Sequence, residues 1–321
     1  MEVTHRILAN DGLSAPAVQL LRDAGFEVRE TRVAQEQLSA YLQEHAITVL
    51  LVRSATQVPA VLIDANPQLC LIGRAGVGLD NIAVAHARKR GVHVINTPDA
   101  SADSVAELVF AHLFNGARDL HTSNREMPLE GDRNFKALKK AFGSGTELRG
   151  KILGIIGFGT IGQAVARMAI GLGMEVNFTD THRDRATLSL EFRDGRSLDF
   201  DLEGSTLEVV LATSDFITLH VPAQDQPLIG ERELALMKPG SGLVNTARGG
   251  VVDEVALLAA LDAGHLRFAA LDVFESEPSP EIQVLMHPGL SLSPHIGGST
   301  REAKARIGMS LAHQIISLLK K

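Results

Sequence analysis

Residues 151–180, KILGIIGFGTIGQAVARMAIGLGMEVNFTD, contain the most specific pattern in the sequence. An apolar run at 152–156 leads into Gly157, Gly159 and Gly162, which have GxGxxG spacing, and then into a stretch with helical periodicity. In a dinucleotide-binding turn these glycines allow a tight turn, close approach of the backbone to a pyrophosphate, and close packing of helix on strand. The helix N-terminus then faces the phosphates. GxGxxG alone also occurs in ordinary loops, but a strand before it and a helix after it predict a Rossmann unit.

Asp180 ends the next predicted strand, EVNFT. At that position a carboxylate accepts hydrogen bonds from the adenosine ribose hydroxyls and repels a 2′-phosphate, so we expect NAD to be preferred over NADP. His182, Arg183 and Arg185 follow closely. As solvated charges they would leave this preference intact, whereas close to a 2′-phosphate they would weaken it.

Composition excludes several classes of protein. Hydrophobic residues make up 45% and charged residues 21% of the chain, an ordinary globular balance. The net charge of −7 argues against a nucleic-acid protein or a polybasic membrane binder. Cys70 is the single cysteine, which leaves no disulfide framework or thiolate metal site. No stretch reaches the roughly eighteen apolar residues of a membrane span. We therefore expect a cytoplasmic protein with a small-molecule substrate, no metal, no membrane and no nucleic-acid partner.

Short β-branched runs alternate with longer amphipathic stretches on both sides of residues 151–180. One series occupies the first hundred residues, and the second continues through GLVNTA, FAALDVF and LSLSP. This alternation indicates an α/β protein with two doubly wound parallel sheets. With 321 residues, the chain can bury two separate cores.

Three segments depart from that rhythm. A long helix is predicted from Ser101, and its apolar side suggests a dimer face. Residues 122–150 are polar and weakly periodic, so we expect a long loop or arm, of which 124–142 would take part in a homodimer. Residues 188–201 alternate on both sides of Asp194-Gly195, which predicts a hairpin with a two-residue turn.

A histidine, a carboxylate and an arginine each follow a predicted strand of the second series. His295 lies in PHIGGST, Glu277 in DVFESEP and Arg248 in NTARGG. Each alone is more often a surface or structural residue. With a nicotinamide bound, however, hydride transfer needs a proton-handling group, a carboxylate that orients it, and a cation for an anionic substrate. Their position at carboxyl ends of strands, where open α/β sheets bind ligands, makes them candidates for those roles.

The segments NTARGGVVDEVAL, AALDVFESEP and LSPHIGGST resemble the signatures of the D-isomer-specific 2-hydroxyacid dehydrogenase family. VRSATQV, GRAGVGLDNI and NTPDASADSVAELVFAHLF extend the resemblance to the first half of the chain. It implies a Rossmann NAD-binding domain at 101–293, inserted into a flavodoxin-like substrate or lid domain at 1–100 and 294–321, with the active site in the cleft between them. It also implies a short form of the enzyme without a C-terminal regulatory domain.

The resemblance assigns roles to individual residues. Arg248 would bind the substrate carboxylate, His295 would be the acid/base, and Glu277 would pair with it. Backbone N–H groups of Val77 and Gly78 would also contact the carboxylate. Asp272 matches a carboxylate near the nicotinamide, although a structural hydrogen-bonding role is an equal alternative. The full cofactor set is Gly157, Gly159, Thr160, Ile161, Gly162, Asp180, His220, Val221, Pro222, Thr246, Ala247, Asp272 and Gly297.

The substrate expected from this resemblance is 3-phosphoglycerate, oxidised to 3-phosphohydroxypyruvate at the entry to serine biosynthesis. Such a substrate carries a phosphate as well as a carboxylate, so it needs a second basic group besides Arg248. Arg53 and Arg74 each follow a predicted strand of the first series and are candidates, with Lys136 of a partner subunit as a further one. The alternative for both arginines is a solvated charge or a structural ion pair.

Two other functions fit the same motifs. A glycerate/hydroxypyruvate, glyoxylate or D-lactate reductase would share Arg248, Glu277 and His295 and differ only in the pocket. A dinucleotide-sensing, corepressor-like protein would share the fold without turnover, because a fold does not determine a function.

Overall fold

The computed structural model describes residues 5–320. The chain divides into two compact units, which we treat separately. Unit 1 comprises Met1–Ala102 and Gly298–Lys321, and unit 2 comprises Asp103–Gly297. The two boundaries thus lie at 102/103 and 297/298, where the sequence suggested 100/101 and 293/294.

Unit 1 alternates strands and helices. In chain order its elements are β1 (Arg6–Ala9), α1 (Ala15–Asp23), β2 (Glu27–Arg29), α2 (Gln35–Glu44), β3 (Val49–Val52), α3 (Ala60–Ala65), β4 (Leu71–Arg74), α4 (Val84–Lys89), β5 (His93–Ile95) and α13 (Arg301–Leu319). All its strands pair in parallel, in the order β2-β1-β3-β4-β5. This is the flavodoxin-like order, in which the connections cover both faces of the sheet.

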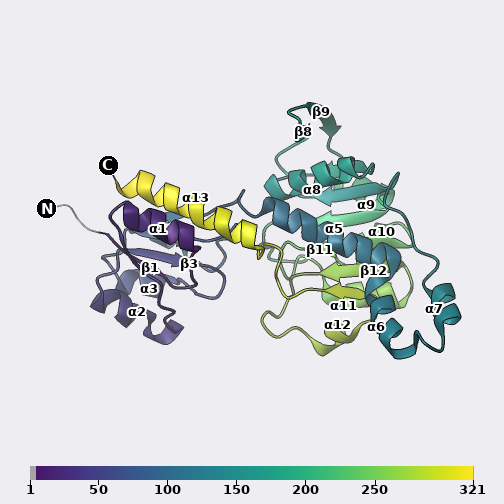
Figure 1. Ribbon diagram of the computed structural model, residues 1–321, viewed down its shortest axis with the longest axis horizontal. Coiled ribbons are helices and arrows are strands. Elements are labelled where there is room, and N and C mark those ends of the chain that lie inside the picture. The colour runs from purple at the N-terminus through teal and green to yellow at the C-terminus, as the bar shows by residue number, and fades with distance from the viewer. Residues whose placement is uncertain (1–4, 321) are drawn as a thin grey trace. The chain divides into compact units, whose positions relative to one another are not determined.

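The two faces of the unit 1 sheet are covered by different helices (Figure 1). Helices α1 and α13 pack together on one face, where Leu21 and Ile315 join the core. Helices α2, α3 and α4 supply Leu38, Ile63 and Ala87 to the core on the other face. Because both faces are buried, β3 is a continuous apolar run, VLLV, rather than an alternating one.

Unit 2 contains the remaining elements. They are α5 (Ala102–Arg118), α6 (Leu120–Glu130), α7 (Phe135–Ala141), β6 (Ile152–Ile156), α8 (Thr160–Gly171), β7 (Glu175–Thr179), β8 (Arg185–Glu191), β9 (Ser197–Glu203), α9 (Leu207–Thr213), β10 (Phe216–Leu219), α10 (Glu231–Leu236), β11 (Ser241–Asn245), α11 (Glu254–Asp262), β12 (Leu266–Leu271), α12 (Ile282–Met286) and β13 (Leu290–Leu292).

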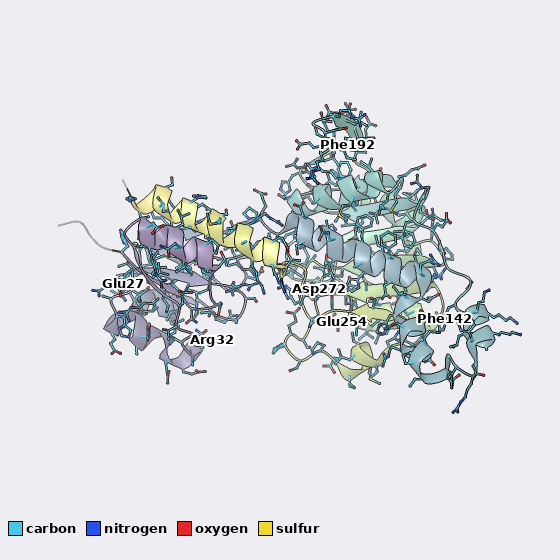
Figure 2. All side chains as sticks on the ribbon, viewed as in Figure 1. Glu27, Arg32, Phe142, Phe192, Glu254 and Asp272 are labelled. Carbon is cyan, nitrogen blue, oxygen red and sulfur yellow. The ribbon has the colours of Figure 1, made fainter. Side chains whose placement is uncertain are left out.

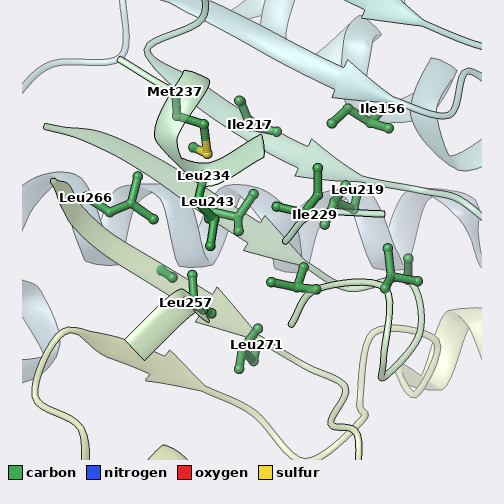
Figure 3. Packing of buried hydrophobic residues seen from close by; sticks show 14 of the residues in the cluster. Ile156, Ile217, Leu219, Ile229, Leu234, Met237, Leu243, Leu257, Leu266 and Leu271 are labelled. Carbon is green, nitrogen blue, oxygen red and sulfur yellow. The ribbon is translucent and has the colours of Figure 1, made fainter. Parts of the chain in front are cut away.

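The main sheet of unit 2 is also parallel throughout, in the order β13-β12-β11-β10-β6-β7. The strand order reverses between β6 and β10, the kind of point at which doubly wound sheets bind ligands. One face packs into a core that includes Ile217, Leu243 and Leu271 (Figure 3). On the other face α5 approaches β12 so closely that a Cβ on Gly116 would lie 2.2 Å from the Phe268 ring. The expected α/β class with parallel sheets is confirmed.

Strands β8 and β9 form a separate antiparallel hairpin, with Phe192 close to its tip (Figure 2). The predicted two-residue turn is wrong. Phe192 N–H donates to Arg196 O at 2.8 Å, so three residues, 193–195, form the loop. Gly195 has φ +84°, and Asp194 Oδ1 accepts from Arg196 N–H, a combination that fits a three-residue loop closed by a left-handed glycine.

Much of the segment expected to be a loop or arm is helical, in α6 and α7. Neither helix buries any of its residues within the chain. Helices without an apolar face turned to a core give no clear 3.6-residue periodicity, and Pro128 lies inside α6, so the sequence of this segment carries no helical pattern. Among residues 5–320 no helix combines the length and apolar character that a membrane crossing requires.

Candidate active site

Three neighbouring strands of unit 2 end at the candidate catalytic residues. Arg248 follows β11, Glu277 follows β12, and His295 follows β13. These strands are adjacent and parallel, so their carboxyl ends share one edge of the sheet. Sheet topology thus brings together three residues that span 47 positions of the sequence.

His295 and Glu277 form a direct pair. His295 Nδ1 lies 2.8 Å from Glu277 Oε2, and both side chains are partly exposed. The second carboxylate oxygen of Glu277 accepts from Phe274 N–H at 3.0 Å. Because Nδ1 is turned to the carboxylate, Nε2 is the nitrogen left for proton exchange with a substrate.

Asp272 holds the loop that carries His295. Its carboxylate is 1% exposed and accepts from the backbone N–H groups of Ile296 and Gly297, each at 2.8 Å, and from Ser293 Oγ at 2.6 Å. His295 itself has φ +52°, in the left-handed region that non-glycine residues seldom adopt. The structural alternative considered for Asp272 is therefore present: it fixes a strained backbone beside the acid/base candidate.

The turn that carries Arg248 is fastened by Asn245. Asn245 Nδ2 donates to Arg248 O at 3.0 Å, and its Oδ1 accepts from Ala247 N–H at 3.0 Å. Gly249 then passes so close to the loop after β12 that a Cβ there would lie 1.8 Å from Phe274 O. The turn after β11 and the loop bearing Glu277 are consequently packed backbone to backbone.

The glycine turn has the geometry that its sequence predicted. Gly157 has φ +92°, and a Cβ on it would lie 2.5 Å from His220 O. A Cβ on Gly162 would lie 2.2 Å from Gly157 O, so the third glycine permits α8 to pack against the turn. A Cβ on Gly159 would meet nothing within 4 Å. Open space above Gly159, with Thr160 and Ile161 beginning α8, leaves room for a pyrophosphate at the helix N-terminus.

Asp180 directly follows β7 and is tied to the same turn. Asp180 Oδ2 accepts from Phe158 N–H at 2.6 Å, and Oδ1 accepts from His182 N–H at 2.8 Å. The carboxylate therefore stabilises the glycine turn, and its contact with a ribose stays a prediction.

Two buried polar atoms support the fit of a nucleotide to unit 2. Within the described chain, Thr246 Oγ1 and His220 Nδ1 are buried without a hydrogen-bond partner. Burial lowers the pKa of His220 to about 3, so its ring is neutral. Unsatisfied buried polar groups are costly, and a bound ligand is one way to satisfy them. Val221 and Pro222 follow His220 in the loop after β10, beside the point where the strand order reverses.

The substrate-binding candidates of unit 1 surround the ends of β3 and β4. Arg53 follows β3, Arg74 ends β4, and Val77 and Gly78 lie in the next turn. Arg53 lines a pocket of about 220 Å³ within unit 1, together with Lys304 of α13 and Ser14 at the start of α1. Lys304 could not be connected with Arg53 from the sequence, because α13 is remote from β3 along the chain. Within residues 5–320 no group of three or more His, Cys, Asp or Glu side chains could hold a metal ion.

Comparison with known proteins agrees with this arrangement. The family described as "D-isomer specific 2-hydroxyacid dehydrogenase, NAD binding domain" matches residues 110–297. Hydroxypyruvate reductase of Thermotoga maritima is 40% identical, over 98% of both chains. D-3-phosphoglycerate dehydrogenase of Methanocaldococcus jannaschii is 38% identical over 98% of this chain but only 57% of its own length. The crystal structure of a glyoxylate reductase from Paecilomyes thermophila has a TM-score of 0.82 and 27% identity, covering 100% of this chain and 97% of that one.

The match of the NAD-binding family model to more than half of the chain, and the full-length similarity to a curated reductase, agree with the sequence motifs. The cofactor is NAD. The chain belongs to the D-isomer-specific 2-hydroxyacid dehydrogenase family and is an NAD-dependent D-2-hydroxyacid dehydrogenase.

Proposed function

We propose that the substrate pair is 3-phosphoglycerate and 3-phosphohydroxypyruvate. The observation that carries this proposal is the pocket of unit 1, in which Arg53 and Lys304 provide two cations beside the N-terminus of α1. Asp11 also lines it, but its carboxylate is occupied by Arg53 N–H at 2.6 Å and by Thr56 Oγ1 at 2.8 Å. Two cations and a helix N-terminus suit a phosphate dianion, which a lactate- or glyoxylate-type substrate lacks.

In this proposal the remaining site residues take the roles that their chemistry allows. Arg248 binds the substrate carboxylate as an ion pair, aided by the N–H groups of Val77 and Gly78. Arg74 is a further candidate for the phosphate. A bound nicotinamide supplies the hydride for reduction and accepts it in oxidation. His295 Nε2 gives a proton to the developing alkoxide in reduction and removes the hydroxyl proton in oxidation. Glu277 stabilises the imidazolium form of His295.

A second candidate is hydroxypyruvate reduction. It is favoured by the 40% identity with the hydroxypyruvate reductase over 98% of both chains. A hydroxypyruvate site requires Arg248 but not the phosphate ligands, so the two candidates differ in what Arg53 does.

Initial rates with NADH and four keto acids test the proposal. Phosphohydroxypyruvate should have the highest kcat/KM of a set that includes hydroxypyruvate, glyoxylate and pyruvate. Arg53→Ala should raise the KM for phosphohydroxypyruvate at least about tenfold, since a charge-assisted contact is worth about 1.5–3 kcal/mol, and should barely change that for hydroxypyruvate. Arg29→Ala is a matched control in unit 1, because Arg29 pairs with Glu27 at the surface.

Three outcomes would redirect the assignment. A higher kcat/KM for hydroxypyruvate than for phosphohydroxypyruvate would leave the second candidate. An Arg53→Ala variant with unchanged kinetics would remove Arg53 from the phosphate site. NADH binding without turnover of any keto acid would favour the dinucleotide-sensing alternative.

We also propose a homodimer formed through α5, α6 and α7. Helices α6 and α7 leave large apolar side chains in solvent, among them Leu120, Met127, Leu129 and Phe135, and α5 exposes Phe114. An apolar surface of this kind is typical of an interface between subunits. Lys136, exposed on α7, is proposed as a further phosphate ligand given to the partner subunit. We propose the cytoplasm as the location, where NAD-dependent metabolism takes place and Cys70, a free thiol, stays reduced.

A further inference from the structure

A buried chain of hydrogen bonds runs from α5 to the loop that carries His295. His112 of α5 is 5% exposed and lies between two serines that flank Leu292 at the end of β13. His112 Nδ1 is 2.8 Å from Ser291 Oγ, and Nε2 is 3.0 Å from Ser293 Oγ. Ser293 Oγ in turn donates to Asp272 at 2.6 Å. An imidazole on a helix is thereby connected to the carboxylate that fixes residues 296 and 297.

The directions of these bonds follow from donor counts. Ser293 has one hydroxyl hydrogen and gives it to Asp272, so Ser293 Oγ must accept from His112 Nε2–H. His112 Nδ1 is then unprotonated and accepts from the Ser291 hydroxyl. Ser291 Oγ also accepts from Asn115 Nδ2 at 2.6 Å, and this bond uses a lone pair and leaves its hydroxyl hydrogen for Nδ1. With a neutral imidazole protonated on Nε2, every donor in the chain has one acceptor.

The environment keeps the ring in that form. Burial lowers the pKa of His112 below its usual value, and the nearby Asp272 opposes this only in part. A neutral imidazole can donate at one nitrogen and accept at the other, which neither an apolar side chain nor a lysine can do. A histidine buried merely to fill space would not need two serines placed one on each side of it.

We propose that His112 is a positioning residue for His295, acting through Ser293 and Asp272. His295 is held at φ +52°, a conformation that persists only where the surroundings impose it. Asp272 imposes it by accepting the N–H groups of the two residues after His295. Ser293 in turn orients the Asp272 carboxylate by donating its hydroxyl hydrogen to it. His112 Nε2–H donates to Ser293 Oγ and so holds the serine hydroxyl in the direction of Asp272. The inference rests on the proposed acid/base role of His295.

The test is a double-mutant cycle on the full chain. His112→Phe keeps a ring of similar shape and removes both nitrogens. It should lower kcat about tenfold to a hundredfold, since small misplacements of reacting groups have effects of that size, while the dissociation constant of NADH stays within twofold. Ser293→Ala should lower kcat similarly. If His112 acts through Ser293, the double variant should be no slower than Ser293→Ala alone.

A conservative variant and a control separate positioning from stability. His112→Gln places an amide N–H where Nε2–H lies and should recover most of the lost kcat. Phe110→Leu alters a residue of α5 that is 2% exposed and takes no part in the hydrogen-bond chain. It should lower the melting temperature about as much as His112→Phe and leave kcat unchanged.

Two results would overturn the positioning role of His112. Both can be distinguished from a failure of the acid/base role proposed for His295. Losses of kcat that multiply in the double variant would mean that His112 does not act through Ser293. A wild-type kcat in His112→Phe, with His295→Asn inactive, would remove the positioning role alone. An active His295→Asn variant would instead contradict the acid/base assignment itself.

Discussion

Glu277 holds His295 with one carboxylate oxygen and its own loop with the other. Oε2 lies 2.8 Å from His295 Nδ1, and Oε1 accepts from Phe274 N–H at 3.0 Å. Because both oxygens are engaged, the carboxylate cannot rotate freely, and the imidazole it contacts has a defined orientation.

This geometry predicts unequal effects for the two members of the pair. His295→Asn should lower kcat by about 10²–10⁴-fold, the usual contribution of a general acid or base, with NADH affinity nearly unchanged. Glu277→Gln should have a smaller effect. Its amide can still contact His295 Nδ1 but carries no charge to stabilise the imidazolium form. Steady-state kinetics with NADH and a keto acid measure both effects, and full activity of His295→Asn would refute the assignment.

Asp180 should determine the choice between NAD and NADP. Asp180→Ala removes the ribose contact and also the bond to Phe158 N–H, so the dissociation constant of NADH should rise at least about tenfold while discrimination against NADPH weakens. Asp184→Ala, at an exposed position in the same segment, is the control. Fluorescence titrations with both dinucleotides provide the measurement. Equal use of NADH and NADPH by the unaltered protein would show that His182, Arg183 or Arg185 overrides Asp180.

The proposed dimer makes α6 and α7 sensitive to added charge. Leu129 is 73% exposed and Phe135 is 56% exposed, so a Leu129→Glu, Phe135→Glu double variant should remain folded but become monomeric. Light scattering coupled to size exclusion reports the mass. Val61→Glu provides the matched control, because Val61 is 74% exposed on α3 of unit 1. A monomeric unaltered protein would rule out the interface.

Burial of His220 should make folding sensitive to acid. The pKa of His220 in the folded state is about 3, below the usual value of 6.5. Between these two pH values the unfolded chain therefore binds more protons at this residue than the folded chain does. The stability contribution is present above pH 6.5 and is lost as the pH falls toward 3. In His220→Phe the fall in free energy of unfolding should be less steep, by up to about 1.4 kcal/mol per pH unit. Urea denaturation at pH 7, 6 and 5 tests this, and parallel curves for the two proteins would contradict it.

Glu254 should have the opposite effect on how the stability of the fold depends on pH. Burial raises its pKa, with repulsion from Glu275 and Glu281 adding to the effect. A carboxyl group with a raised pKa in the folded state contributes stability at pH values below its pKa in the unfolded state. That contribution is lost as the pH rises through the folded-state pKa. Glu254→Gln keeps an acceptor for Glu275 N–H without the charge, so it should raise the melting temperature at pH 7. The gain should shrink toward pH 4, and a lower melting temperature at pH 7 would be the contrary result.

The parts of this protein that the sequence predicted are local in the chain. GxGxxG and Asp180 lie within one β-α-β stretch, where backbone geometry dictates residue type. His295 and Glu277 could be paired in advance because each follows a strand, and parallel strands share an edge. The pairing is confirmed by the 2.8 Å contact, although the roles of the two residues stay predictions.

The parts that were missed depend on partners distant in sequence. His112 contacts Ser291 and Ser293, which lie 179 and 181 positions further along the chain. No periodicity in the sequence predicts such a bond. Helices α6 and α7 lack a buried face, so the signal for a helix is absent from their sequence. The hairpin was recognised from its alternation, but the length of its loop depends on one hydrogen bond, Phe192 N–H to Arg196 O.

A hydrogen bond between the two ends of unit 2 has a consequence for protein engineering. Ser104 Oγ donates to Gly297 O at 2.6 Å, so the chain enters and leaves this unit at one point. A segment whose ends meet can be transplanted as a cassette into another host, or its ends can be joined and new termini opened at a surface turn. Residues 103–297 carry the glycine turn, Asp180 and the His295–Glu277 pair together, so such a graft would move the nucleotide site and the proton-transfer pair in a single piece.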